Sequence, residues 1–339
     1  MDAADGDWFV IDGGSKNMRI GYTRDGGPTL MENRKEDIEH LYENGVISDC
    51  SLFGELIERL CDDNGWNLKN QKVIVTEPVL NTVDNRVQLL QFFFDKLHVE
   101  ELHLISQPAA ALCEALGRVE DKTGIVVNIG ATNIQITAVE NSKPVINSNV
   151  TLSIGGDDVS NLLQKLLLEK GYLVTARRTE VIEELKTDMC TVANDFDERL
   201  ENTSDEKVVL GQNVFKIGKE LIEPPELLFQ PKKFGKDSMG IIEGIQECIK
   251  KWGVNNEENY SNIILCGGSS QINLMNTRIE KDLEKVLKLT PTIHSLGSHA
   301  TWQGALHSRF PDSISREKYE EFGTSIVGFH PKKSARTVR

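Results

Sequence analysis

The stretch FVIDGGSKNMRIGY, residues 9–22, decides the fold of this chain. It predicts a buried strand, a Gly-Gly turn and a second strand, which together form a β-hairpin. The turn places a carboxylate (Asp12), a hydroxyl (Ser15) and two cations (Lys16 and Arg19) beside the glycine backbone at Gly14. Such a group of side chains suits the binding of a phosphate chain and its metal ion.

A second stretch, IVVNIGATNIQITA at residues 125–138, repeats this pattern after a full domain's length. The positions that correspond are Val10 and Val126, Asp12 and Asn128, Gly14 and Gly130, Asn17 and Asn133, and Ile20 and Ile136. A repeated unit of this kind predicts two similar halves, each offering one loop to a ligand between them.

A third stretch, SNIILCGGSS at residues 261–270, is an apolar strand that ends on two glycines and two hydroxyls. Glycine lets the backbone pass close to a flat ligand such as a nucleoside. Together with the two hairpin turns, this stretch predicts the third wall of a nucleotide cleft.

Length and composition indicate a globular chain rather than a nucleic-acid-binding or membrane protein. The 339 residues suggest about two domains. A net charge of −14 opposes direct binding to a phosphate backbone, which needs a basic face. The six cysteines are scattered without a CxxC pair, and neither a signal peptide nor an apolar run of about 18 residues is present, so we expect reduced thiols and a cytosolic or nuclear location without membrane insertion.

Hydrophobic periodicity predicts several further elements. Gln107 follows a predicted strand, at the edge where ligands of α/β sheets collect. The elements expected are a surface connection over 31–40, a helix from 51, a strand over 72–78, a helix over 85–97, a strand over 103–108 that runs into a helix, a helix over 180–200, a small hairpin over 208–217, a rigid connector over 224–231 and helices over 239–252 and from 273.

Several collinear segments make the chain resemble actin and the actin-related proteins, of the actin, sugar kinase and Hsp70 ATPase superfamily, across nearly its whole length. The segments that carry the resemblance are VTEPVLN (75–81), QPAA (107–110), LLEKGY (167–172), ELK (184–186), CTVANDF (190–196), PELLFQP (225–231), LCGG (265–268) and SIV (325–327).

The resemblance implies an actin-like ATPase fold with two RNase H-like halves around a cleft that holds ATP or ADP with Mg²⁺ or Ca²⁺. The first half would comprise residues 1–117 and 302–339, with 31–44 as a shortened subdomain 2. The second half would comprise residues 118–301, with subdomain 4 inserted at about 154–244.

The resemblance also implies roles for individual residues. Asp12 matches an aspartate near the metal, which it would hold through waters. Ser15 matches a phosphate-contacting serine, and Arg19 takes the place of a phosphate-contacting lysine. Gln107 matches a glutamine that helps to position the attacking water, where Gln135 gives weaker support. The remaining predicted nucleotide contacts are Gly14, Lys16, Asn128, Gly130, Ala131, Thr132, Gly156, Lys186, Gly268 and Ser269.

The departures from the family pattern concern hydrolysis and the adenosine pocket. Asn128 and Ala131 replace aspartates and Gln135 replaces a histidine, and an amide cannot act as a base. Hydrolysis should therefore be slow or absent. The adenosine pocket is altered too, because Glu183, Thr187, Ile272 and Ser298 stand where the family has arginine, glutamate, tyrosine and lysine.

Only a short charged connector lies between Leu30 and Asn44, where actin carries the loop that grips the next subunit. A head-to-tail filament needs that contact at every subunit. We therefore expect a nucleotide-binding structural subunit whose partners are other proteins of a multisubunit complex, including actin or actin-related proteins, in the cytoplasm or, alternatively, the nucleus. The alternatives are a polymerising cytoskeletal protein and a small-molecule kinase, for which Asp158 is the candidate carboxylate.

Overall fold

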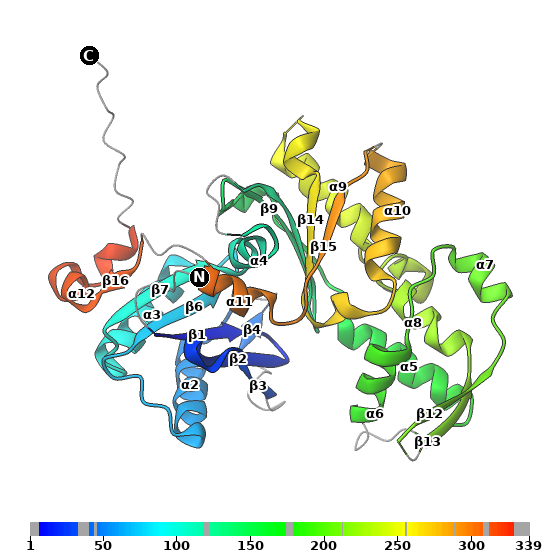
Figure 1. Ribbon diagram of the computed structural model, residues 1–339, viewed down its shortest axis with the longest axis horizontal. Coiled ribbons are helices and arrows are strands. Elements are labelled where there is room, and N and C mark those ends of the chain that lie inside the picture. Colours follow the sequence, from blue (N-terminus) through cyan, green and yellow to red (C-terminus); the bar gives the residue numbers. More distant parts are fainter. Residues whose placement is uncertain are drawn as a thin grey trace.

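The computed structural model contains two six-stranded β-sheets that are joined through a pair of helices (Figure 1). It describes residues 7–32, 41–43, 46–117, 122–173, 179–211, 213–254, 256–287, 289–307 and 312–328.

The first sheet has six strands in the order β16-β7-β6-β1-β2-β3. The strands β1, β6 and β7 are parallel, whereas β1, β2 and β3 form an antiparallel meander. This sheet contains the predicted hairpin, with Asp12 opposite Arg19. Its strands are β1 (Trp8–Gly13), β2 (Asn17–Tyr22), β3 (Thr29–Glu32), β6 (Lys72–Glu77), β7 (Glu101–Ser106) and β16 (Ile314–Ser315).

The second sheet repeats this arrangement. Its strands follow the order β10-β9-β8-β14-β15, with β11 also paired to β9. Here β8, β14 and β15 are parallel and β8 and β9 form the hairpin, with Asn128 opposite Gln135. The predicted internal repeat is thus confirmed. These strands are β8 (Gly124–Ile129), β9 (Ile134–Glu140), β10 (Lys143–Pro144), β11 (Val150–Leu152), β14 (Asn262–Cys266) and β15 (Thr292–Ser295).

Strand β1 is buried on both faces, as a run of apolar residues predicts. Phe9 and Ile11 pack in a cluster with residues of α2 (Cys50–Asn64) and α3 (Val83–Gln91). Trp8 and Val10 pack on the other face against α4 (Gln107–Leu116) and α11 (Ala300–His307). The helix α2 begins at Cys50, one residue before its predicted start, and the side chain of Asp49 caps it by accepting a hydrogen bond from the Leu52 amide at 2.9 Å.

The helices α4 and α11 lie between the two sheets and contact both (Figure 1). Ala109 and Ala110 face the first sheet, and Ala111 and Leu112 belong to the cluster that includes Val126 of the second. Small side chains let the two helices approach closely: a Cβ at Gly304 would lie 1.8 Å from the carbonyl oxygen of Ala110. This pair of helices packs against both sheets and so forms the floor of the cleft between them.

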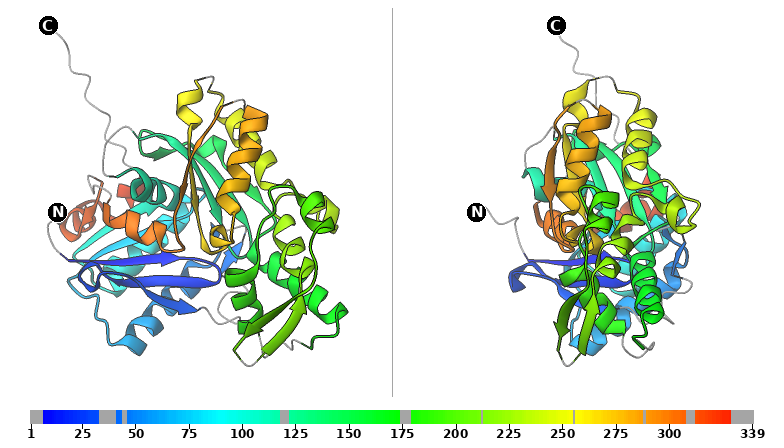
Figure 2. Two further views of the ribbon diagram at one scale, coloured as in Figure 1. Left: turned by 45° about the vertical axis from the view of Figure 1, so that its right-hand side comes forward. Right: turned by 90° about the vertical axis from the view of Figure 1, so that its right-hand side faces the viewer.

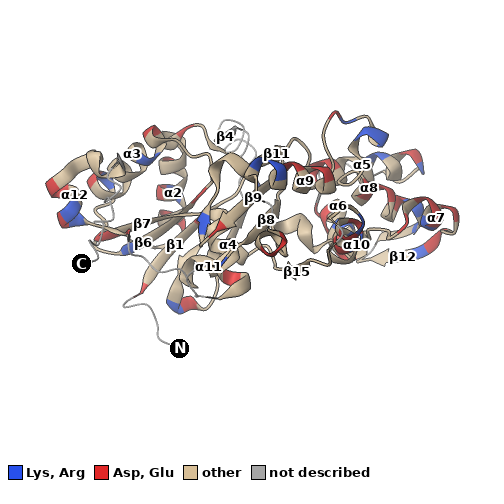
Figure 3. Ribbon diagram, turned by 90° about the horizontal axis from the view of Figure 1, so that it is seen from above, with Lys and Arg blue, Asp and Glu red and all other residues tan. Residues whose placement is uncertain are grey.

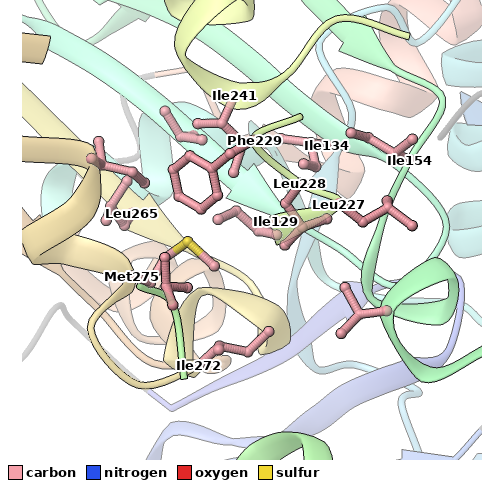
Figure 4. Packing of buried hydrophobic residues seen from close by; sticks show 14 of the residues in the cluster. Ile129, Ile134, Ile154, Leu227, Leu228, Phe229, Ile241, Leu265, Ile272 and Met275 are labelled. Carbon is pink, nitrogen blue, oxygen red and sulfur yellow. The ribbon is translucent and has the colours of Figure 1, made fainter. Parts of the chain in front are cut away.

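The other face of the second sheet carries the largest core cluster (Figure 4). Ile129 and Leu265 from the sheet pack there with Phe229, Ile241 and Met275 from the surrounding helices and loops. The helices and the small hairpin of this part are α5 (Gly156–Glu169), α8 (Glu223–Glu226), α9 (Ile241–Trp252), α10 (Met275–Leu287), β12 (Glu206–Leu210) and β13 (Asn213–Ile217).

The prediction of one helix over 180–200 is wrong. The structure has α6 (Thr179–Glu184), a π-helical turn over Leu185–Met189 and, after an extended segment, α7 (Phe196–Glu201). The extended segment bonds elsewhere: the amide of Thr191 donates to Leu221 and that of Val192 to Asn273. Such partners are distant in sequence, so periodicity does not detect them.

Two further local predictions change. Part of the connector expected over 224–231 is the short helix α8, and residues 31 and 32 of the expected surface connection extend β3. Residues 33–40, which form most of the shortened subdomain 2 predicted at 31–44, lie outside the described part of the chain. The described residues beside them form a small hairpin of β4 (Tyr42–Glu43) and β5 (Val46–Ile47).

Acidic and basic residues are mixed on α7 and α12 (Arg316–Phe322), as Figure 3 shows. No helix in the described ranges combines the length and apolar character needed to cross a membrane.

Candidate functional site

A cavity of about 380 Å³ opens between the two sheets. It is lined by the turns of both hairpins, by the loop after β14 and by the π-helical turn. Every predicted site residue except Thr132 and Gly156 lines this cavity. Those that do are Asp12, Gly14, Ser15, Lys16, Arg19, Gln107, Asn128, Gly130, Ala131, Gln135, Lys186, Gly268 and Ser269.

The two hairpin turns meet across the cavity. The Thr132 hydroxyl donates to the Ser15 hydroxyl at 3.2 Å, so Thr132 joins the turns although it does not line the cavity. The Lys16 ammonium lies 3.0 Å from the carboxylate of Glu183 and 3.9 Å from that of Asp157, both on the second half. Asp157 belongs to α5 and Glu183 to α6. Figure 2 shows the tip of the β1–β2 hairpin reaching toward these two helices.

Asp12 is fixed at the end of β1. It is 4% exposed, and its Oδ1 accepts hydrogen bonds from Thr76 at 2.6 Å and from the Gln107 amide at 3.5 Å. Gln107 also donates to the Gly13 carbonyl at 2.9 Å. Burial raises the pKa of Asp12, and the guanidinium of Arg19, 3.7 Å from Oδ2, offsets only part of that effect.

Close backbone contacts explain the glycines of the second half. The amide of Gly156 donates to the Gly130 carbonyl at 2.9 Å, and that of Asp157 donates to Ala131 at 2.8 Å. A Cβ at Gly156 would lie 2.1 Å from the Ser269 hydroxyl oxygen. Gly156 therefore supports the cavity wall from behind instead of lining it.

Lys186 forms a buried network in the wall of the cavity. Its ammonium donates to the Ser160 hydroxyl at 2.9 Å, the Glu183 carboxylate at 2.7 Å and the Gly156 carbonyl at 3.3 Å. Burial acts to raise the pKa of Glu183, but the ion pair with Lys186 and the hydrogen bonds outweigh it, so that this pKa lies below its usual value. Since an ammonium has three donors, Lys186 holds the wall together.

The described lining also includes residues that the sequence analysis did not assign to the site, among them Leu30, Tyr42, Gln271 and Thr301. Tyr42 lies in the segment expected as a shortened connection, and its hydroxyl is buried beside Gly13. Burial and the charge of Asp12 raise the pKa of Tyr42. No local pattern marks these positions, because only the tertiary fold brings them to the cavity.

The four altered adenosine-pocket positions divide into two groups. Glu183, Thr187 and Ser298 line the cavity. Ile272 is 3% exposed and packs in the core of the second half instead. Its replacement of a tyrosine therefore affects packing rather than a ligand contact.

The lining fits a phosphate chain. The Nε of Arg19 and the hydroxyl of Tyr42 are buried, and neither has a hydrogen-bond partner among the described residues. Arginine donors and glycine-turn amides are common phosphate ligands, and the cavity volume lies within the usual range of about 300–1,000 Å³ for ligand sites.

The lining does not fit a divalent cation. Magnesium and calcium take oxygen ligands, and among these only carboxylates also balance the charge of the ion. The carboxylates among the described lining residues are Asp12 and Glu183. Arg19 lies beside the first, and Lys16 and Lys186 pair with the second. Asn128 and Gln135 contribute neutral amides and Ala131 contributes no ligand atom.

Comparisons with known proteins agree with this architecture. The actin family model matches residues 29–332. Actin-related protein 2 of Acanthamoeba castellanii is 30% identical over 319 residues, covering 82% of this chain and 81% of that protein. Actin-related protein 2 of Schizosaccharomyces pombe is 27% identical over 325 residues, with the same coverage. Centractin of the same yeast is 27% identical over 259 residues, covering 74% of this chain and 67% of centractin. With its duplicated sheets and central cleft, this chain belongs to the actin family.

Proposed function

We propose that this chain is a nucleotide-holding structural subunit of a larger protein assembly, with slow or absent ATP hydrolysis. The observation that carries the proposal is the cavity at which both hairpin turns and the loop after β14 converge. ATP or ADP bound there contacts both halves at once. It therefore acts as a clamp that fixes the angle between them and the shape of the surface offered to partners.

The residues around the cavity support binding over hydrolysis. The Gln107 amide is committed to the Gly13 carbonyl and lies near Asp12. Gln135 and Asn128 carry amides, which cannot accept a proton from water as a base does. Gln107 and Gln135 can thus help to position the attacking water, but neither can accept a proton from it.

The proposed partners are proteins. Two relatives are named actin-related protein 2 and one is named centractin, which supports a role among actin-related subunits. We place the chain in the cytoplasm, with the cytoskeleton, and treat the nucleus as the alternative. The division into halves at residues 117/118 and 301/302, and subdomain 4 at about 154–244, belong to the same proposal.

The structure gives the kinase alternative little support. Asp158, its candidate carboxylate, does not line the cavity. Its side chain accepts from the Gly155 amide at 2.9 Å and pairs with Lys236 at 2.5 Å. Asp158 is thus engaged in capping α5.

The test is the nucleotide content of the purified protein, measured by denaturing it and separating the released bases, followed by phosphate release over hours. We expect bound nucleotide and turnover near zero. The variant R19Q should carry less nucleotide, whereas R24Q, a control at an exposed ion pair with Asp7, should retain it. Steady turnover would contradict the structural role, and protein that neither carries nor binds nucleotide would refute the whole proposal.

Pelleting after addition of ATP and Mg²⁺ tests the polymerising alternative. The chain has only residues 33–40 between β3 and the segment that begins at Leu41, which leaves little length for a loop that grips a neighbour. We expect the protein to stay in the supernatant. Sedimentation that depends on ATP would restore the filament-forming alternative.

A further inference from the structure

We infer that the cleft binds its nucleotide without a divalent cation, with Arg19 supplying the positive charge that a metal ion would otherwise bring to the phosphates. The inference rests on the proposed nucleotide binding. It departs from the family resemblance, which implies Mg²⁺ or Ca²⁺ beside the phosphate chain.

The first argument is the charge of the cavity wall. Its described lining residues include three fixed cations, Lys16, Arg19 and Lys186, and two carboxylates, Asp12 and Glu183. Each carboxylate already has a cation within 4 Å. The excess charge is therefore positive before any ion binds, which favours an anionic ligand and opposes a second cation.

The second argument is the state of Asp12. Its Oδ1 accepts hydrogen bonds from Thr76 and Gln107, and its Oδ2 faces the guanidinium of Arg19 at 3.7 Å. A divalent ion approaching Oδ2, directly or through a water, would meet that charge. Asn128, at the corresponding position of the second hairpin, is a neutral amide and cannot compensate.

The third argument is the free donor on Arg19. The side chain is 12% exposed, and its Nε has no hydrogen-bond partner among the residues described. A guanidinium binds phosphate through parallel hydrogen bonds and keeps its charge at any physiological pH. Arg19 thus brings a neutralising charge to the cavity lining, and its buried Nε is a donor that the described residues leave unused.

The experiment is calorimetric titration of nucleotide-stripped protein with ATP, once in Mg²⁺ and once in EDTA. We expect the same dissociation constant in both buffers. Binding that requires Mg²⁺ overturns this inference and leaves the proposed function standing. An absence of binding in both buffers refutes the proposed function and this inference with it.

Two variants sharpen the test. N128D adds a third carboxylate to the described cavity lining and should make binding at least about tenfold tighter in Mg²⁺ than in EDTA. Its control, N276D, makes the same change at an exposed position of α10 and should remain insensitive to metal. An N128D protein that binds equally in both buffers would contradict the assigned reason for metal independence.

R19Q removes the proposed counter-charge. Its affinity in EDTA should fall about 10- to 100-fold, as expected for losing charge-assisted hydrogen bonds. R24Q should bind as the wild type does, and circular dichroism checks that both variants fold. If R19Q folds and binds ATP in EDTA as tightly as the wild type, Arg19 is not the counter-charge.

Discussion

Arg278 and Glu226 form a bidentate ion pair in the core of the second half. The N–O distances are 3.0 and 3.1 Å, and Glu226 is 0% exposed. Replacing Arg278 with methionine leaves the buried carboxylate of Glu226 without its cation. R278M should therefore lower the free energy of unfolding by about 3–5 kcal/mol, as measured by urea denaturation.

Two further variants separate this explanation from simple loss of packing. The double variant R278M/E226L should lose less stability than R278M, because no unpaired charge remains. K250M, which breaks an exposed pair with Glu247, should change stability by about 0–1 kcal/mol. If the double variant is less stable than R278M, the loss of stability in R278M comes from packing and not from the unpaired charge of Glu226.

His103 makes stability depend on pH. It is buried in β7, and burial lowers its pKa to about 4 against the opposing charges of Asp312 and Glu101. As the pH falls below about 6.5, His103 binds a proton in the unfolded chain, whereas in the folded chain it stays neutral until about pH 4. Stability contributed by neutral His103 is therefore present above pH 6.5 and lost between pH 6.5 and 4, by up to about 3 kcal/mol.

The variant H103Q should lose less stability than the wild type when denaturation is measured at pH 7 and at pH 4.5. The control H98N removes an exposed histidine whose positive φ asparagine tolerates, and it should keep the pH profile of the wild type. Equal losses for H103Q and the wild type would assign the pH dependence to other groups.

Sequence reasoning located the side chains that sit in repeated local patterns. Asp12, Arg19, Asn128 and Gln135 occupy matching positions of two hairpins, so their approach to one cavity followed from the repeat. Tyr42 belongs to no repeat and reaches the cavity only through the packing of its segment on the first sheet. Such a placement depends on tertiary contacts that one sequence does not display.

The helices α4 and α11 depend on one glycine for their close packing. A Cβ at Gly304 would lie 1.8 Å from the carbonyl oxygen of Ala110. This oxygen belongs to the main chain, which cannot move aside as the end of a flexible side chain can. G304A should therefore lower the free energy of unfolding by about 1–3 kcal/mol or more, since overpacking forces the helices apart.

Thermal denaturation measures the effect of G304A. The control is G297A, just before α11, where an added methyl meets nothing within 4 Å, and it should be close to neutral. Because α4 and α11 support both sheets, G304A should also weaken ATP binding. A G304A protein as stable as the wild type would show that the helices separate at little cost.

Elements with a self-contained pattern were easier to predict than those set by distant partners. The strand β6 follows from a local run of apolar residues and the helix α9 from local helical periodicity, and both lie close to their expected bounds. The interval over 180–200 also has helical spacing, yet residues 191 and 192 leave the helix to bond Leu221 and Asn273. Local periodicity could not reveal that competition.

The two halves are held together strongly at the floor of the cleft, which α4 and α11 form, and weakly at its mouth, where the contacts between them are partly exposed. At the floor, α4 and α11 bury apolar surface against both sheets. At the mouth, the described cross-cleft contacts include the Lys16–Glu183 pair, whose side chains are 32% and 31% exposed. A partly exposed pair of this kind contributes about 0–1 kcal/mol, so the mouth needs a ligand to be held firmly.

Nucleotide should therefore stabilise the molecule far more than the ion pair does. At ATP concentrations 100 times the dissociation constant, linkage adds about 2.7 kcal/mol to the free energy of unfolding. K16M should cost the nucleotide-free protein no more than about 1 kcal/mol, as measured by urea denaturation with and without ATP. If K16M destabilises the nucleotide-free protein more than ATP stabilises the wild type, the ion pair, and not the nucleotide, holds the cleft at its mouth.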